Sequence, residues 1–158
     1  MIRIGIGYDS HRLVAERPLI LGGQRIPFGL GLAGHSDADA VSHALTDALL
    51  GAAALGDIGD LFPDTDPRWK GADSIQLLRQ AVALLQERGF SPLQTDITVI
   101  LERPRLAPFF PAMAEALSGA TGIPAGAVGL KAKTNEGMGF IGRGEGIAVI
   151  AVATIGTA

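Results

Sequence analysis

The sequence predicts one α+β domain of two layers, in which a mixed four-stranded sheet carries its helices on one face. The first observation is size, because 158 residues suit a single domain, which we place at residues 1–158. The second is composition, since 47% hydrophobic and 18% charged residues are typical of a chain that folds. The third is the order of elements, namely strand, hairpin, two helices, strand, helix and two strands, which favours a sheet with segregated helices.

The N-terminal half contains a strand, a hairpin and a long helix. Apolar alternation predicts a strand over residues 3–8, and a glycine pair between two short apolar runs predicts a hairpin over residues 19–26. Apolar residues at helical spacing predict a helix over residues 37–55. Ser36 and Asp39 resemble a capping box at the start of this helix.

The C-terminal half alternates helices and strands. Helical spacing predicts a helix over residues 73–87, and a proline near its start marks another over residues 108–119. Alternation predicts strands over residues 95–101 and 128–133. Residues 146–158 are apolar on both faces of a predicted strand, which needs cover on both sides. We expect another subunit to cover the second face.

Composition also excludes several classes of function. A net charge of −3 without a run of Lys or Arg argues against nucleic acid as a partner. The apolar stretch 146–158 is too short to span a bilayer, and no signal peptide is visible before Asp9, so we expect no membrane partner and a cytoplasmic location. The chain has no cysteine, so only imidazole and carboxylate groups remain as strong metal ligands.

Asp9, His11 and His43 form a candidate metal set. Positions 9 and 11 lie on the same side of a strand, and the helix over residues 37–55 supplies His43. Three such ligands leave an open position on a tetrahedral ion such as zinc, as in catalytic sites. The alternative is an Asp–His hydrogen bond at a strand end and an unrelated histidine.

Two aspartates flank His43 on the predicted helix. Asp39 and Asp47 lie four residues before and after it, where a carboxylate can orient a ligand imidazole. Ordinary solvated helix charge explains both aspartates equally well.

A second candidate site follows the strand over residues 128–133. Thr134 and Glu136 lie beside two lysines and precede a glycine-rich loop that contains Arg143. Backbone amides of such a loop can hold phosphate oxygens, and Glu136 can bind a hard cation such as magnesium. The alternative is a plain connection with Arg143 in solvent. The loops 56–59 and 62–66 can likewise accept hydrogen bonds from sugar hydroxyls or simply form turns.

Five ordered motifs closely resemble the 2-C-methyl-D-erythritol 2,4-cyclodiphosphate synthase family of the non-mevalonate isoprenoid pathway. They span residues 7–11, 33–39, 43–59, 62–66 and 139–146. The resemblance implies a homotrimer of α+β subunits whose sheets face the threefold axis, with active sites between neighbouring subunits.

The resemblance also implies a reaction and its catalytic groups. The family converts 4-diphosphocytidyl-2-C-methyl-D-erythritol 2-phosphate into the cyclic diphosphate and CMP. By motif position, Asp9, His11 and His43 are expected to bind Zn²⁺. Glu136 is expected to bind a Mg²⁺ or Mn²⁺ that bridges the substrate phosphates. His35 and Thr134 resemble the pair that polarises phosphate oxygens.

The resemblance also implies which residues contact the substrate. Asp57 resembles the residue that holds the cytidine ribose. Loop 62–66 resembles the loop that lies along the methylerythritol moiety. Loop 101–107 resembles the cytosine-binding loop of the neighbouring subunit. Phe140 and Arg143 match positions lining a central trimer cavity, which in some members holds an isoprenoid diphosphate. The expected binding residues are Asp9, His11, His35, Ser36, Asp57, Ile58, Gly59, Phe62, Pro63, Asp64, Thr65, Asp66, Leu101, Pro104, Arg105, Ala107, Lys133, Thr134, Asn135, Glu136, Phe140 and Arg143.

Two departures from the family pattern affect these contacts. Lys133 and Asn135 flank Thr134 where many members carry further threonines, so side-chain contacts at both positions are in question. Glu102 and Arg103 replace the small or amide residues expected in the cytosine loop.

Two other functions stay open on the sequence alone. A non-catalytic trimer would bind nucleotides or isoprenoid diphosphates in the same pockets without releasing CMP, and the presence of His35, Thr134 and Glu136 together argues against it. A metal-dependent phosphohydrolase would use water as the nucleophile and leave a linear bisphosphate. The lack of an evident extra base argues against this second function.

Overall fold

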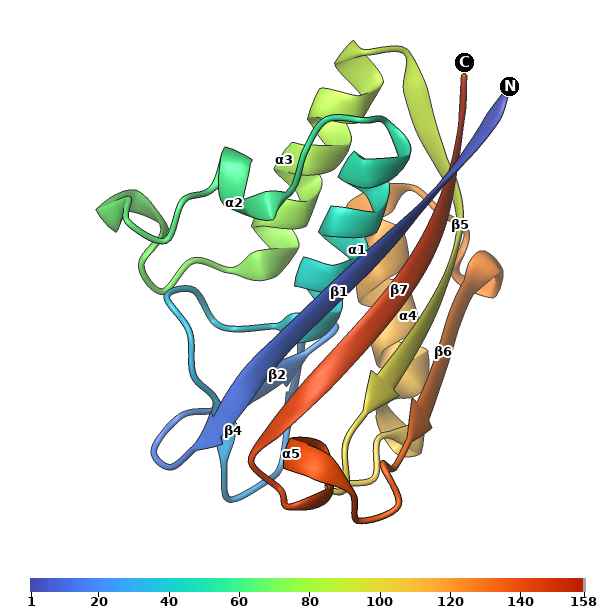
Figure 1. The fold of residues 1–158 in the computed structure, drawn as a ribbon. Helices are drawn as coiled ribbons and strands as arrows, with labels where there is room; N and C mark the ends of the chain where they lie inside the picture. Colours follow the sequence, from blue (N-terminus) through green and yellow to red (C-terminus); the bar gives the residue numbers. More distant parts are fainter. Residues whose placement is uncertain (158) are drawn as a thin grey trace.

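The computed structural model describes residues 1–157 and has an α+β fold built on one curved sheet (Figure 1). Three short 3-10 turns supplement the regular elements, at Pro67–Trp69, Ala107–Phe109 and Ala125–Ala127. The strands are β1 (Ile2–Val14), β2 (Leu19–Leu21), β3 (Gln24–Ile26), β4 (Gly31–Leu32), β5 (Phe90–Ile100), β6 (Val128–Lys133) and β7 (Gly146–Thr157). The helices are α1 (Ala40–Ala52), α2 (Ile58–Leu61), α3 (Ser74–Glu87), α4 (Phe110–Thr121) and α5 (Gly139–Gly142).

The main sheet has five strands in the order β4-β1-β7-β5-β6, and β2 and β3 form a separate hairpin. It is mixed, because β5 and β6 are parallel whereas the other neighbours are antiparallel. The prediction of four strands was therefore wrong by one. The additional strand, β4, pairs only Gly31 and Leu32 with the end of β1, and two residues are too few to show any periodicity.

The helices α1, α3 and α4 cover one face of the sheet, behind β1 and β7 in Figure 1. Two glycines allow the close approach of α1 to β1. A Cβ atom at Gly5 would overlap the carbonyl oxygen of Ala48, and one at Gly7 would overlap that of Ala44. Because α1 carries His43 and β1 carries His11, this contact sets the spacing of the candidate metal ligands.

The opposite face of β1 is apolar and has no cover from residues 1–157. Its side chains Ile2, Ile4, Ile6 and Tyr8 are 72%, 69%, 70% and 56% exposed. They alternate with Gly5 and Gly7, which face α1, and β7 continues the same outer surface beside them. Isolated apolar side chains on a surface are normal, but a row of four along one strand is typical of an interface.

Most predicted elements are confirmed with shifted ends. The strand over 128–133 matches β6, and the helices of the C-terminal half lie within about two residues of their predicted positions. The strand predicted over residues 95–101 begins earlier, at Phe90. The last strand reaches Thr157, and position 158 lies outside the described residues. Segments 58–61 and 139–142, which were expected to be loops, each form one helical turn.

Two predictions in the N-terminal half need correction. The first strand continues to Val14 instead of ending near residue 8, because pairing with β7 extends to Arg12 opposite Gly146. The helix α1 begins at Ala40, and its N-cap is Asp39, whose side chain accepts from the amide of Ser42. A capping box at Ser36 is therefore absent. In the described part of the chain, the helices are all too short or too polar to cross a membrane.

Candidate metal centre and substrate pocket

The side chains of Asp9, His11 and His43 converge where β1 passes α1. Asp9 Oδ2 lies 2.8 Å from His11 Nε2 and 3.2 Å from His43 Nδ1, and the two ring nitrogens are 3.3 Å apart. One potential ligand atom from each residue lies within 4.8 Å of the others. The predicted set is thus brought together, with one carboxylate and two imidazoles facing a common point.

The second nitrogen of each imidazole is held by a hydrogen bond that leaves the converging nitrogen free. His11 Nδ1 donates to the carbonyl oxygen of Ala33 at 2.7 Å. His43 Nε2 donates to Ser74 Oγ at 2.8 Å, with Ser36 Oγ also near at 3.2 Å. With the remaining proton of each ring held by these outer hydrogen bonds, a divalent cation can replace any proton on the inward nitrogens, so the donor set fits such a cation.

The two imidazoles stabilise the charged form of Asp9. Burial raises the pKa of Asp9, but hydrogen bonds and charge from His11 and His43 outweigh burial and leave this pKa below its ordinary value. Burial lowers the pKa of His11, but its contact with Asp9 outweighs burial and raises this pKa. The Asp9 carboxylate therefore keeps its negative charge for a neighbouring positive group.

The two aspartates that flank His43 on α1 have roles other than orienting its ring. Asp39 is fully buried and accepts from the amides of Gly22 and Gly23 at 2.9 and 2.8 Å, so it joins the β2–β3 hairpin to α1. Asp47 accepts from the amide of Ile58 at 2.8 Å and fixes the start of α2. Burial raises the pKa of Asp47, and nearby carboxylates add to that shift. Neither aspartate is an ordinary solvated helix charge.

The residues that orient His43 were missed in the sequence. Ser74 Oγ accepts from His43 and donates to Asp37, whose carboxylate also accepts from the Ser74 amide at 3.1 Å. Ser74 is fully buried at the first position of α3. No sequence pattern relates positions 37, 43 and 74, because they come from three different elements.

We expect Ser74→Ala to weaken the binding of zinc by about 10-fold. Removing a hydrogen-bond partner of a ligand imidazole typically costs 10- to 100-fold in metal affinity, and Ser36 Oγ retains part of the support. Competition with a chromophoric chelator measures this change. Ser118→Ala, on the remote helix α4, serves as control, and equal zinc affinity of both variants would contradict the role of Ser74.

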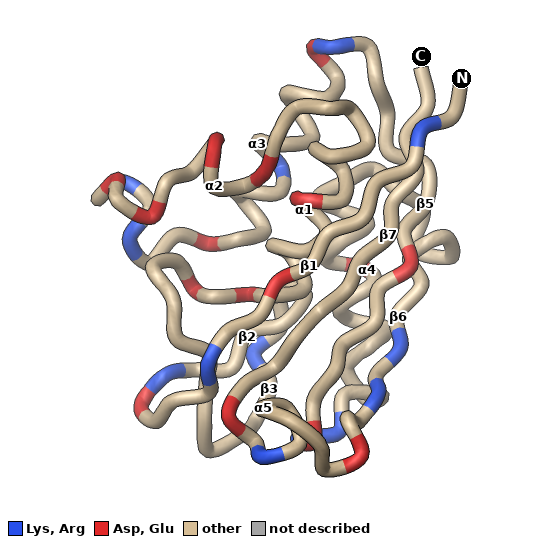
Figure 2. The backbone as a smooth tube through the Cα atoms, in the orientation of Figure 1, with Lys and Arg blue, Asp and Glu red and all other residues tan. Residues whose placement is uncertain are grey.

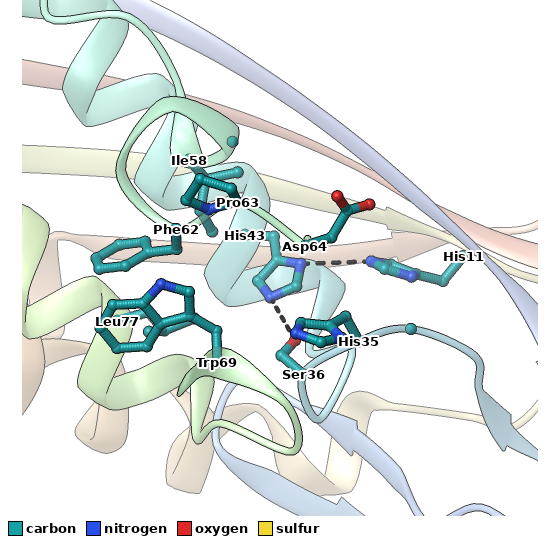
Figure 3. A pocket seen from close by; sticks show the side chains of 12 residues that line it. His11, His35, Ser36, His43, Ile58, Phe62, Pro63, Asp64, Trp69 and Leu77 are labelled. Atoms are coloured by element: carbon teal, nitrogen blue, oxygen red, sulfur yellow. Dashed lines mark hydrogen bonds between the residues drawn. The ribbon is translucent and has the colours of Figure 1, made fainter. Parts of the chain in front are cut away.

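A pocket of about 400 Å³ opens beside the metal ligands. Figure 3 shows His43 between His11 and Ser36, with Phe62, Trp69 and Leu77 on the other side of the cavity. The rings of Phe62 and Trp69 meet edge to face at 5.0 Å. The residues that line the pocket are His11, Gly34, His35, Ser36, His43, Ile58, Gly59, Phe62, Pro63, Asp64, Trp69 and Leu77.

The pocket includes most of the predicted residues of loops 34–36 and 57–64. His35 is held at its edge, where its Nε2 lies 3.0 Å from the carbonyl oxygen of Asp66. Asp57 is exposed at the N-cap of α2, in a capping box with Asp60. The sequence did not predict that Trp69 and Leu77 form an apolar wall of the pocket, because Trp69 lies in a polar loop and Leu77 on a helix.

Thr134 and Glu136 lie in a different region, at the opposite edge of the sheet. A second pocket of about 410 Å³ forms there between loop 101–107 and the end of β6. Figure 2 shows Lys and Arg along β6 and its adjoining loops. The pocket is lined by Leu101, Glu102, Arg103, Pro104, Arg105, Leu106, Ala107, Phe110, Ala132, Lys133 and Thr134. Within one chain, the predicted metal-binding and catalytic residues thus divide into two separate groups.

Glu102, a departure from the family pattern, connects the two loops at this edge. One of its oxygens accepts from the amides of Asn135 and Gly137, both at 3.1 Å. These bonds flank Glu136, whose backbone has a positive φ of 52° that is uncommon for a side chain with a Cβ. Asn135 itself donates to the carbonyl oxygen of Met138 at 2.8 Å. Glu102 therefore shapes the loop that presents Glu136.

Phe140 lies on α5 and Arg143 directly after it, and neither lines the two pockets above; Phe140 instead lines a smaller pocket that also contacts His11. Phe140 is 39% exposed and packs near Gly146, while Arg143 reaches Glu145 at 3.3 Å. The helix α5 lies close to the start of β7, at the same end of the molecule as the loop that follows β5 (Figure 1).

The sequence profile of the YgbB family matches residues 2–156. The chain belongs to this family. Curated relatives include the 2-C-methyl-D-erythritol 2,4-cyclodiphosphate synthase of Symbiobacterium thermophilum, 59% identical over 152 residues that make up 96% of this chain and 97% of the relative. The synthase of Salinibacter ruber is 56% identical over 157 residues, 99% of this chain and 100% of the relative. The predicted family resemblance is confirmed.

Solved structures agree with this assignment. The bifunctional IspDF of Campylobacter jejuni superposes with a TM-score of 0.96 and 42% identity, over all of this chain and 43% of that longer one. A 2C-methyl-D-erythritol-2,4-cyclodiphosphate synthase in a CDP-bound form gives a TM-score of 0.89 and 47% identity, over 98% and 100% of the two chains. The CDP complex of IspF from Plasmodium falciparum gives 0.86 and 31%, over 99% and 96%.

Proposed function

We propose that this protein converts 4-diphosphocytidyl-2-C-methyl-D-erythritol 2-phosphate into 2-C-methyl-D-erythritol 2,4-cyclodiphosphate and CMP. The observation that carries the proposal is the metal-ligand set of Asp9, His11 and His43 on the wall of a pocket large enough for a small phosphorylated sugar. Relatives that match nearly the whole chain are named for this synthase activity. The product belongs to isoprenoid precursor synthesis.

The reaction is an intramolecular phosphoryl transfer. An oxygen of the 2-phosphate attacks the β-phosphorus, the bond from that phosphorus to the bridging oxygen breaks, and CMP leaves with the electron pair. No side chain has to act as nucleophile, so the protein contributes orientation and charge neutralisation. His35 and Thr134 are proposed to donate hydrogen bonds to phosphate oxygens as charge shifts between them.

Asp9, His11 and His43 would hold Zn²⁺, and Glu136 would hold Mg²⁺ or Mn²⁺. When bound, these cations neutralise the phosphate groups that must approach each other and fix their in-line geometry. The roles of the second-nitrogen hydrogen bonds are to keep both imidazoles in the binding tautomer.

We further propose a homotrimer in which each active site combines two neighbouring chains. One chain would supply the metal pocket beside β1, and its neighbour would supply loop 101–107 with Thr134 and Glu136 beside β6. The two pockets share no lining residue and lie beside strands β1 and β6, which the order β4-β1-β7-β5-β6 separates by β7 and β5; this separation supports completion of each site by a neighbouring chain. The open apolar face of β1 provides the packing surface around the threefold axis.

The cytidine would occupy the second pocket. Backbone groups of loop 101–107 can read the base, and Asp57 of the other chain can hold the ribose hydroxyls. Phe140 and Arg143 would then face the centre of the trimer, where an isoprenoid diphosphate is a candidate ligand. The cytoplasmic location stays a prediction.

Phosphorus NMR of the purified protein with substrate, zinc and magnesium tests the proposed reaction. We expect cyclic diphosphate and CMP, and loss of both after treatment with a chelator. CMP with a linear bisphosphate would contradict the synthase and favour hydrolysis, whereas binding of CDP without CMP release would favour a non-catalytic protein.

We expect Thr134→Ala to lower kcat by about 10²-fold while KM changes less than about threefold. A donor that acts on charge developing in the transition state contributes to rate more than to ground-state binding. Steady-state release of CMP measures both constants. Ser118→Ala, on helix α4, serves as control, and an unchanged kcat would remove Thr134 from the mechanism.

A further inference from the structure

The segment of residues 33–36, which carries His35 and Ser36, has no helical or strand structure, yet each of its four backbone carbonyl groups has a donor from elsewhere. Ala33 accepts from His11 at 2.7 Å, and His35 accepts from the amide of Gly71 at 2.7 Å. A loop without secondary structure holds its shape only through such external partners. The donors to Gly34 and Ser36 therefore help to decide where the His35 side chain lies.

Both of those donors belong to one side chain, Arg17. Its Nη1 donates to the carbonyl oxygen of Gly34 at 3.1 Å, and its Nη2 donates to that of Ser36 at 2.9 Å. The planar guanidinium thus spans His35 from both sides with two bonds in a fixed fork. A lysine carries the same charge but has no such planar pair of donors.

The backbone of Arg17 is itself held in place. It lies in the connection between β1 and β2, and a Cβ atom at Gly31 of β4 would overlap the carbonyl oxygens of Arg17 and Pro18. The edge strand therefore packs directly on the residue that carries the fork. The Nε atom of Arg17, in contrast, is buried without a hydrogen-bond partner in residues 1–157. A buried unpaired donor costs free energy, which the two hydrogen bonds of Nη1 and Nη2 offset in part.

The held segment touches the metal centre at two points. Gly34 lies against the ring of His11, where an added Cβ would come within 3.2 Å of two ring atoms. Ser36 Oγ lies 3.2 Å from His43 Nε2. Movement of residues 34–36 would therefore displace His35 and loosen the support of both metal-ligand rings.

We propose that Arg17 is a positioning residue for His35. Resting on the proposed function, this inference assigns Arg17 the task of holding the carbonyl groups on either side of His35, so that the imidazole keeps its place beside the substrate phosphates. Arg17 would act without touching the substrate itself. Misplacement of a catalytic group by about 1 Å can cost about 10²-fold in rate.

The test compares Arg17→Ala and Arg17→Lys with Arg25→Ala, which removes a charge from an exposed arginine on β3. We expect Arg17→Ala to lower kcat for CMP release by roughly 10- to 100-fold, and Arg17→Lys to recover only a small part of it. Guanidinium ion at millimolar concentration should restore turnover to Arg17→Ala more than methylammonium does. The Arg25→Ala variant should match the wild type with and without guanidinium.

Hydrogen exchange at the Gly71 amide provides a readout that needs no turnover. This amide donates to His35, so loosening of residues 34–36 in Arg17→Ala should speed its exchange roughly tenfold while amides of the buried helix α1 keep their rates. Wild-type turnover in Arg17→Ala, or unchanged Gly71 exchange, would overturn the proposal. So would a loss of activity that guanidinium leaves unrestored and that follows a general loss of thermal stability.

The two levels of the proposal fail in different ways. If the wild type released no CMP, the proposed function would fall, and Gly71 exchange alone would still decide whether Arg17 holds the segment. If the wild type is active and Arg17→Ala is equally active, the synthase stands and the positioning role falls.

Discussion

Replacing His43 with alanine should abolish turnover while the protein remains folded. His43 supplies Nδ1 to the metal-ligand set from the half-buried side of α1, and the fully buried core of this helix consists of other residues. Losing a metal that contributes several kcal/mol of transition-state stabilisation corresponds to about 10³-fold or more in rate. Metal content, circular dichroism and CMP release together measure the effect.

His35→Ala is the matched control for His43→Ala. His35 lines the same pocket but lies outside the metal-ligand set, so this variant should lose turnover and retain zinc. Full activity of His43→Ala without zinc, or its unfolding, would count against the assignment of His43. Zinc retention by His43→Ala would count against the ligand set as a whole.

Gly7→Ala should strongly destabilise the fold. The added Cβ would overlap the carbonyl oxygen of Ala44 on α1, and backbone atoms on both sides leave little room to adjust. Overpacking of this kind costs about 1–3 kcal/mol and occasionally more, and we expect the upper end or beyond. Since roughly 1 kcal/mol moves Tm by about 2–4 °C at this size, thermal unfolding should show a loss of about 10 °C.

Gly119→Ala makes the same chemical change in open space on α4. Nothing lies within 4 Å of the added Cβ, and alanine favours a helix by about 1 kcal/mol over glycine, so this variant should be as stable as the wild type or more so. A Gly7→Ala protein with wild-type Tm would show that α1 is free to move away from β1. The spacing of His11 and His43 would then need another explanation.

The sequence carried enough information for the metal set because its ligands follow local rules. Asp9 and His11 share one side of a strand through simple alternation, and His43 lies on a helix with clear apolar periodicity. These rules hold even though the first strand is longer than predicted. The polar residues from Asp9 onward break the apolar alternation, so the sequence did not predict that the strand continues. This continuation depends on pairing with β7.

The parts that could not be predicted depend on contacts between distant elements. Ser74 meets His43 only because α3 packs beside α1, and β4 exists only because two residues pair with the end of β1. Arg17 likewise gains its partners through the folding of a connection against the loop at residues 34–36. Nothing in local spacing relates such positions, and the family resemblance, which implies roles for His35 and Thr134, does not explain what holds them.

The most direct test of the account is complementation between two inactive variants. His43→Ala disables the metal pocket, and Glu136→Gln disables the proposed second cation site at the other edge of the sheet. In a random mixture of equal amounts within a closed ring, about one quarter of the interfaces combine an intact metal pocket with an intact neighbouring loop.

The measurement is CMP release after the two variants are unfolded together and refolded. If each active site is shared between neighbouring chains, the mixture should recover about a quarter of the wild-type rate, while each variant refolded alone stays inactive. A mixture that remains inactive, although the wild type regains its rate under the same treatment, would contradict a site built from two chains.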